Sequence, residues 1–193
     1  MIDPIPTPTK PEDSPKGLVL AIAAYLLWGF LPIYMKALAH VPAVEVIAHR
    51  VIWSVPVAGL VLWWLGRTAD LWAALRSPRM IGMAALTAAL ISVNWGIYVW
   101  AIQSGHALEA ALGYYINPLF SIFLGAALLK ERLAPAQMAA IGLAALAVLV
   151  LTWEAGQVPV VALGLTLSWG AYAFLKKQLP LGPNQGFMLE LLI

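Results

Sequence analysis

Six apolar runs of membrane-spanning length follow residue 16 and decide the fold class. A helix of about 20 apolar residues crosses the roughly 30 Å hydrocarbon core of a bilayer. The runs lack the alternation of transmembrane strands, and helices satisfy their own backbone hydrogen bonds in lipid. Only 10% of the residues are charged, against roughly 25% in an ordinary soluble domain. The sequence therefore predicts an all-α, polytopic membrane helix bundle.

Basic residues in the connections predict how the bundle is oriented. The predicted spans are residues 17–38, 44–65, 80–103, 108–129, 135–153 and 158–175, and residues 185–193 open a further helix. Nine basic residues lie in the tail or in alternate connections: Lys10, Lys16, Arg67, Arg76, Arg79, Lys130, Arg132, Lys176 and Lys177. Only Lys36 and Arg50 lie toward the other side. Because cytoplasmic loops are enriched in Lys and Arg, we expect a cytoplasmic N-terminus.

A weak internal repeat suggests how the helices are organised. Four residues recur 141 positions apart in one register: Trp28, Gly29, Lys36 and Pro42 match Trp169, Gly170, Lys177 and Pro183. The offset spans an odd number of helices, so the two copies would be inverted, as in many secondary transporters. Chance matches between apolar segments are the alternative. We predict a disordered cytoplasmic tail at residues 1–16, a first five-helix repeat at 17–154, and the start of a second repeat at 155–193.

Four segments resemble the RarD family, in the EamA group of the drug/metabolite transporter superfamily. They read AAYLLWGFLPIYMKAL, EVIAHRVIWS, NWGIYVWAIQSGHALEAALGYYINPL and LGAALLKERL, and the resemblance extends from Gly17 to the end. It implies a bacterial inner-membrane permease of ten helices, built from two inverted EamA repeats. On that basis we expect this chain to be a truncated product that lacks helices 7 to 10.

Ionisable residues inside spans are costly and mark candidate functional positions. Arg50 lies about six residues into its helix, hence roughly 9 Å along it. It is a candidate binder of an anionic or polar solute group, and the alternative is an arginine that snorkels or pairs near the interface. Glu45 and His49 share a helix face and are candidates for proton coupling. Their alternative is an interfacial hydrogen bond.

Polar groups on two adjacent helices are further candidates for the solute path. They are Asn94, Tyr98, Tyr114 and Asn117. A short loop makes these helices antiparallel neighbours, so their polar faces could line one cavity, although interhelical hydrogen bonds would serve equally. Pro118 frees a backbone carbonyl beside Asn117 and is a candidate hinge.

The leading functional prediction is a permease that moves a small organic solute, drug or metabolite by alternating access. One alternative is a non-transporting fragment that needs a partner or a second copy. A remote alternative is an intramembrane enzyme that uses Ser92, Ser104, Ser121 or His106, although no nucleophile signature surrounds them. We expect the lipid bilayer and a solute as partners, leave a homo-oligomer open, and expect no nucleic acid, cofactor or metal, because glycine-rich phosphate loops and metal-ligand motifs are missing.

Overall fold

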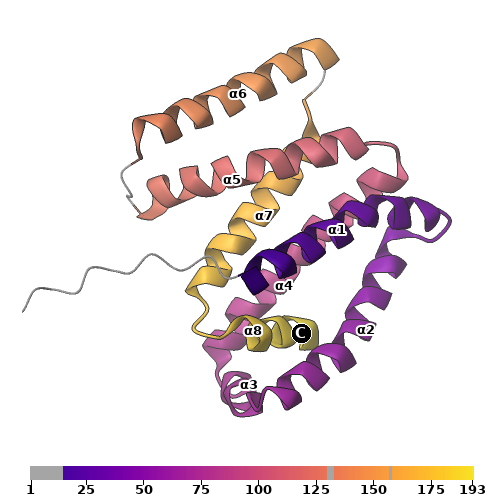
Figure 1. The fold of residues 1–193 in the computed structure, drawn as a ribbon, viewed down its shortest axis with the longest axis vertical. Helices are drawn as coiled ribbons and strands as arrows, with labels where there is room; N and C mark the ends of the chain where they lie inside the picture. The colour runs from indigo at the N-terminus through magenta and orange to yellow at the C-terminus, as the bar shows by residue number, and fades with distance from the viewer. Residues whose placement is uncertain (1–14, 130–132, 157) are drawn as a thin grey trace, which may run out of the picture.

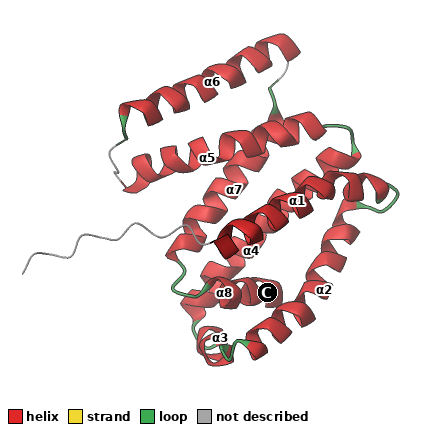
Figure 2. Ribbon diagram, in the orientation of Figure 1, coloured by secondary structure: helices red, strands yellow, loops and turns green. Residues whose placement is uncertain are grey.

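The described residues of the chain form helices joined by short loops (Figures 1 and 2). The structure, a computed structural model, describes residues 15–129, 133–156 and 158–193. The helices in these residues are α1 (Pro15–Ala37), α2 (Ala43–Trp64), α3 (Thr68–Leu75), α4 (Pro78–Gln103), α5 (Ala107–Leu129), α6 (Pro135–Ala155), α7 (Val160–Gln178) and α8 (Pro183–Leu192). The predicted all-α membrane bundle is confirmed.

Within the described residues, five helices are long and apolar enough to cross a membrane: α1, α2, α4, α5 and α6. The sixth predicted span, α7, is not among them. Its last turn holds Lys176 and Lys177, which reduce its apolar length. The short helix α3 was not predicted and lies in the connection after α2.

Some sequence predictions fall on residues outside the described ranges. These are residues 1–14 of the predicted tail, together with the basic residues Lys130 and Arg132. The remaining part of that tail, Pro15 and Lys16, already belongs to α1. Proline is favoured at the first helical position, where a backbone N–H is not needed. Pro78, Pro135 and Pro183 likewise begin α4, α6 and α8.

Helix α7 occupies the interior of the bundle and packs against α4 and α5. Its approach to α5 is close at Gly113, where an added Cβ would lie 2.9 Å from the carbonyl oxygen of Ala162. The hydroxyl of Thr166 donates to the carbonyl of Gly113 over 3.0 Å. Small residues allow membrane helices to approach so closely. Figure 1 shows α7 passing from α5 toward α8, while α6 lies beside α5 at the edge.

Two clusters of buried apolar side chains lie between the helices. One cluster joins α1, α2, α4, α5 and α7 around residues such as Met35, Val99 and Leu165. The side-chain amide of Gln103 strengthens it by donating to the carbonyls of Leu38 and Val41 in the α1–α2 connection. The second cluster joins α2, α3, α4 and α8; its buried members are Leu62, Leu71, Ala74, Ala84, Met188 and Leu189.

The outer helices expose apolar side chains, as lipid contact requires. On α1, Leu20 and Leu27 are each 70% exposed, and Phe30 is 67% exposed. Such a surface would be unstable in water but is at no disadvantage against hydrocarbon. Polar contacts lie inside the bundle, between α4, α5 and α7 and between α7 and α8.

Candidate functional site

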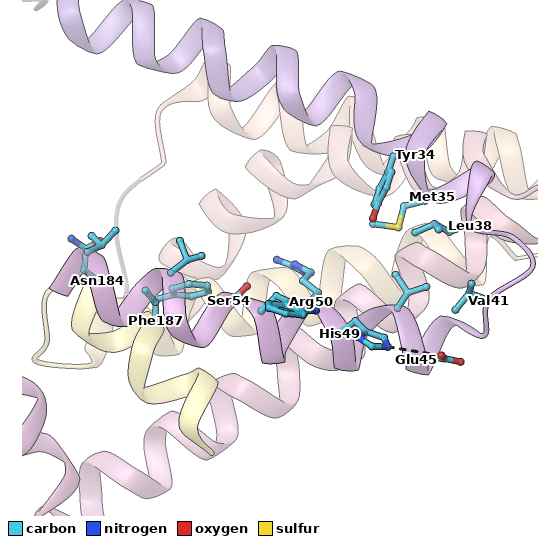
Figure 3. Close-up of a pocket in the computed structure, with 15 residues that line it drawn as sticks. Tyr34, Met35, Leu38, Val41, Glu45, His49, Arg50, Ser54, Asn184 and Phe187 are labelled. Carbon is cyan, nitrogen blue, oxygen red and sulfur yellow. Dashed lines mark ion pairs between the residues drawn. The ribbon is translucent and has the colours of Figure 1, made fainter. Parts of the chain in front are cut away.

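A pocket of about 820 Å³ lies between α1, α2 and α8 (Figure 3). This volume lies in the range of pockets that hold small organic ligands. The lining residues are Tyr34, Met35, Leu38, Val41, Glu45, Val46, His49, Arg50, Trp53, Ser54, Val57, Ala58, Val61, Asn184 and Phe187. Most are apolar or aromatic, and a few are polar. Such a lining suits a solute with an apolar body and few polar groups.

Arg50 is the cation in this lining. Its guanidinium lies over the ring of Trp95 on α4, with Cζ 3.3 Å from the ring centroid. Within the described part of the chain, Arg50 forms no hydrogen bond or ion pair with a protein group. A guanidinium carries five N–H donors, so these donors are available to a solute.

Glu45 and His49 line the same pocket but interact weakly. Glu45 Oε1 and His49 Nε2 are 3.9 Å apart, and their side chains are 58% and 63% exposed. This distance is too long for a hydrogen bond. Figure 3 shows the pair and Arg50 projecting from α2 in different directions. The pair is therefore a loosely held, solvent-accessible group beside the pocket, and its role in proton coupling stays a prediction.

A smaller cavity of about 70 Å³ adjoins the pocket between α2, α4, α7 and α8. The two spaces share Arg50, Ser54 and Phe187 in their linings. The small cavity adds Ile47, Val51, Ala88, Ile91, Ser92, Trp95, Tyr172, Glu190 and Leu191. Arg50 thus stands where a large apolar space meets a small, more polar one.

The other predicted site residues lie outside both linings. Asn94 is fully buried, and its amide donates to the carbonyl of Leu165 over 3.0 Å and to the hydroxyl of Ser168 over 2.9 Å. In the conformation described, Asn94 joins α4 to α7. A role in solute binding stays a prediction for this residue.

Tyr98 and Tyr114 belong to a continuous series of aromatic rings. Tyr98 contacts Trp95 at 5.6 Å and Tyr114 at 5.7 Å between ring centroids. Tyr114 contacts Trp169 at 6.5 Å, and Trp169 contacts Tyr172 at 5.7 Å. The first three pairs are edge-to-face, an arrangement that stabilises buried aromatic groups, and the fourth is tilted. The series links the ring under Arg50 to the lining of the small cavity through α4, α5 and α7.

Asn117 and Pro118 lie together on α5. Asn117 is 5% exposed, and neither atom of its side-chain amide has a hydrogen-bond partner among the described residues. An unsatisfied buried amide is costly. Helix α5 remains continuous through Pro118. The predicted hinge therefore lies beside an amide that forms no hydrogen bond with the described residues in this conformation. Hinge motion stays a prediction.

Among the residues that the structure describes, one serine hydroxyl contacts a histidine ring, at the end of α4. The Ser104 hydroxyl lies 3.0 Å from His106 Nδ1 and donates to the carbonyl of Trp100 over 2.7 Å. The His106 ring stacks on Trp100. These interactions complete the C-terminus of α4 and are exposed. Among the described residues, no group of three or more His, Asp or Glu side chains could hold a metal ion.

Several residues around Arg50 were not singled out from the sequence. They are Ser54, Trp95, Tyr172 and Glu190, whereas Ser92 was named only as a candidate nucleophile. Glu190 carries a signal that could have revealed it, because a carboxylate within the apolar segment FMLELL is costly. Trp95 and the serines carry no such signal, since their role depends on which helices become neighbours.

The fold and its pocket define a class, the multi-pass α-helical membrane proteins with a solute-sized hollow among the helices. Residues 15–153 match the EamA-like transporter family, and the chain belongs to this family. The resemblance to the RarD group is confirmed as well. The chain is 44% identical over 174 residues to Protein RarD of Streptomyces exfoliatus, covering 90% of this chain and 55% of that protein.

Two further relatives agree. Protein RarD of Escherichia coli K12 is 39% identical over 179 residues, covering 93% of this chain and 60% of that protein. An uncharacterized transporter of Pseudomonas aeruginosa is 43% identical over 176 residues, covering 91% and 59%. The chain thus spans little more than half the length of these relatives. No solved structure matches it.

Proposed function

We propose that this chain takes part in moving a small organic solute, drug or metabolite across the bacterial inner membrane by alternating access. The observation that carries this proposal is the free guanidinium of Arg50 in a pocket of about 820 Å³ with mostly apolar walls. Membership of the EamA-like transporter family supports it. The relatives named above are an uncharacterized transporter and two RarD proteins.

In this proposal the pocket holds the apolar body of the solute, and Arg50 binds its polar group. Residues 17–154 act as a first repeat and residues 155–193 as the start of an inverted second one. Asn94, Tyr98, Tyr114 and Asn117 become solute contacts when the interface between α4, α5 and α7 rearranges. The buried, unpartnered amide of Asn117 supports such a rearrangement, with Pro118 as the hinge. The exposed Glu45–His49 pair carries the coupling proton.

The orientation belongs to the same proposal. The N-terminus and the α2–α4 connection are placed in the cytoplasm, because Arg67, Arg76 and Arg79 lie in or beside that connection. The end of the pocket lined by Glu45 then lies toward the opposite side of the membrane.

Replacement of Arg50 tests the proposed site. In proteoliposomes that contain Arg50→Gln, we expect solute flux at low concentration to fall at least about tenfold, the effect of about 1.4 kcal/mol of binding. Arg79→Gln is the control, since Arg79 is exposed and lines neither cavity. A panel of radiolabelled organic acids, amines and neutral amphiphiles supplies the solutes.

Equal flux through wild type and Arg50→Gln would remove Arg50 from the solute path. Solute binding without flux for every compound would favour a chain that needs a partner or a second copy.

A further inference from the structure

A buried ion pair joins α7 to α8 at the end of the small cavity. Lys176 Nζ lies 2.7 Å from Glu190 Oε1, and the two side chains are 22% and 5% exposed. Gly186 makes room for this contact, because an added Cβ there would lie 3.1 Å from Lys176 Nζ. The hydroxyl of Tyr172 lies 3.4 Å from the second Glu190 oxygen. Glu190 is therefore a carboxylate whose charge is neutralised within the protein.

Two side chains of opposite charge line the small cavity. Glu190 and Arg50 both line it, together with the hydroxyls of Ser54 and Ser92. Lys176 neutralises Glu190, whereas Arg50 has no ion-pair partner within the described residues. The cavity and its immediate surroundings thus carry one uncompensated positive charge. In a space of low dielectric constant, such a charge strongly favours a single anionic group.

We propose that the small cavity is a subsite for the anionic group of an amphipathic monoanion, most simply a carboxylate, and that Lys176 determines this preference by neutralising Glu190. This inference rests on the proposed function only in taking the adjoining pocket as the place of the solute's apolar body. Arg50 offers a planar fork of donors that matches a carboxylate. Ser54 on α2 and Ser92 on α4 add hydroxyl donors to the lining.

The size of the cavity agrees with such a group. Its volume of about 70 Å³ is several times the roughly 10–15 Å³ that one water molecule requires. A carboxylate of three heavy atoms fits a space of this order. Its single negative charge also matches the single uncompensated positive charge, which a doubly charged phosphate would exceed.

The second acidic residue near Arg50 belongs to a different environment. Glu45 lies five residues earlier on α2, about 7.5 Å along the helix axis. It lines the large pocket and not the small cavity, and its side chain is 58% exposed. Exposed charges are screened by water and ions. Glu45 therefore does not enter the charge balance of the small cavity.

Binding of three matched probes tests the subsite in the purified 193-residue chain. Benzoate, benzamide and benzylammonium share an aromatic body and differ in charge. Their dissociation constants would be measured by ligand-dependent thermal stabilisation in detergent or lipid nanodiscs, which requires no flux. We expect benzoate to bind at least about tenfold more tightly than benzamide or benzylammonium, as an uncompensated cation in the cavity lining predicts.

A charge cycle then isolates the role of Lys176. We expect Glu190→Gln to tighten benzoate binding, because the cavity gains a second uncompensated cation. Lys176→Gln should weaken it about tenfold by leaving Glu190 unopposed. The double variant K176Q/E190Q should return to within about threefold of wild type, since its net charge is restored. Glu154→Gln and Lys177→Gln, at exposed positions that line neither cavity, should change the constant less than about twofold.

Two results would overturn the inference. One is benzamide binding as tightly as benzoate, and the other is a double variant that stays as weak as Lys176→Gln although it unfolds at the wild-type temperature. Failure of transport is a separate outcome. Charge-dependent benzoate binding without flux supports the subsite and counts against the proposed transport. Flux without charge-dependent benzoate binding supports the proposed transport and counts against the subsite.

Discussion

Arg50 and Asn94 show how two polar residues inside a membrane bundle are accommodated in different ways. Arg50 stacks on Trp95 and keeps its donors directed to a pocket. The side-chain amide of Asn94 donates hydrogen bonds to the carbonyl of Leu165 and the hydroxyl of Ser168. A cation over an aromatic face contributes about 0.5–2 kcal/mol, depending on its solvation. The first arrangement leaves binding capacity free, and the second uses it to join helices.

Asn94→Ala separates a packing role from a solute-binding role. We expect the free energy of unfolding to fall by about 1 kcal/mol, because two interhelical hydrogen bonds are lost. Benzoate affinity in the described conformation should change by less than about twofold, because Asn94 lies outside both cavities and would contact solute only after the proposed rearrangement. Thermal unfolding in detergent and probe binding are measured on the same sample.

Thr152→Ala is the matched control for this change. Its hydroxyl donates only to the carbonyl of Val148 within α6, so stability should be nearly unaffected. A loss of benzoate binding in Asn94→Ala at unchanged stability would place Asn94 in contact with the solute before any rearrangement.

Helix α7 illustrates how neighbours decide the character of an element. Its sequence predicts a membrane span, yet its composition falls short of the other five helices. Residues Val161, Leu165 and Gly170 are buried against α4 and α5. A helix enclosed by other helices does not need a fully apolar surface. Small and polar residues in α7 therefore serve close packing.

The close approach of α5 and α7 makes Gly113 intolerant of larger side chains. An alanine there would place its Cβ 2.9 Å from the backbone oxygen of Ala162. The helices would have to separate, and the hydrogen bond from Thr166 would lengthen. We expect Gly113→Ala to lower the free energy of unfolding by about 1–3 kcal/mol. Thermal unfolding in detergent measures the change.

Gly142→Ala provides the control in α6. No atom lies within 4 Å of a Cβ added at that position. Alanine also has the higher helix propensity, so stability should be unchanged or slightly raised. Equal unfolding temperatures for wild type and Gly113→Ala would show that α5 and α7 are not held as closely as described.

At the level of the whole molecule, apolar surface points outward and polar contacts lie inside. Leu27 and Phe30 on α1 are largely exposed, whereas Asn94 and Glu190 are buried. This distribution is the reverse of a water-soluble protein. The surrounding lipid therefore contributes to the stability of the fold, because it solvates the outer faces of α1 and α6.

The absence of cysteine from the sequence allows a direct test of orientation. We expect a membrane-impermeant maleimide to label Ala39→Cys and Ala107→Cys from the periplasmic side of intact spheroplasts. Ala73→Cys, in α3, should be labelled only in inside-out vesicles, because three arginines lie in or beside its connection. All three positions are exposed. Labelling of Ala39→Cys and Ala73→Cys from the same side would contradict the proposed topology.

Helix number, order and boundaries followed from the sequence, with few exceptions. Apolar length alone placed the long helices to within a few residues, because a bilayer imposes that length on each span. The helix α3 was missed, since eight residues carry too short a pattern. The family followed from long matching segments, and its membership is confirmed.

The site depended on contacts between distant segments. Arg50 was recognisable as a costly charge in an apolar helix. Its stacking on Trp95, its cavity shared with Glu190 and the Lys176–Glu190 pair required α2, α4, α7 and α8 to meet. The apolar length of each segment indicates whether it can span the bilayer. Which faces then touch depends on close packing at residues such as Gly113, and that packing exists only in three dimensions.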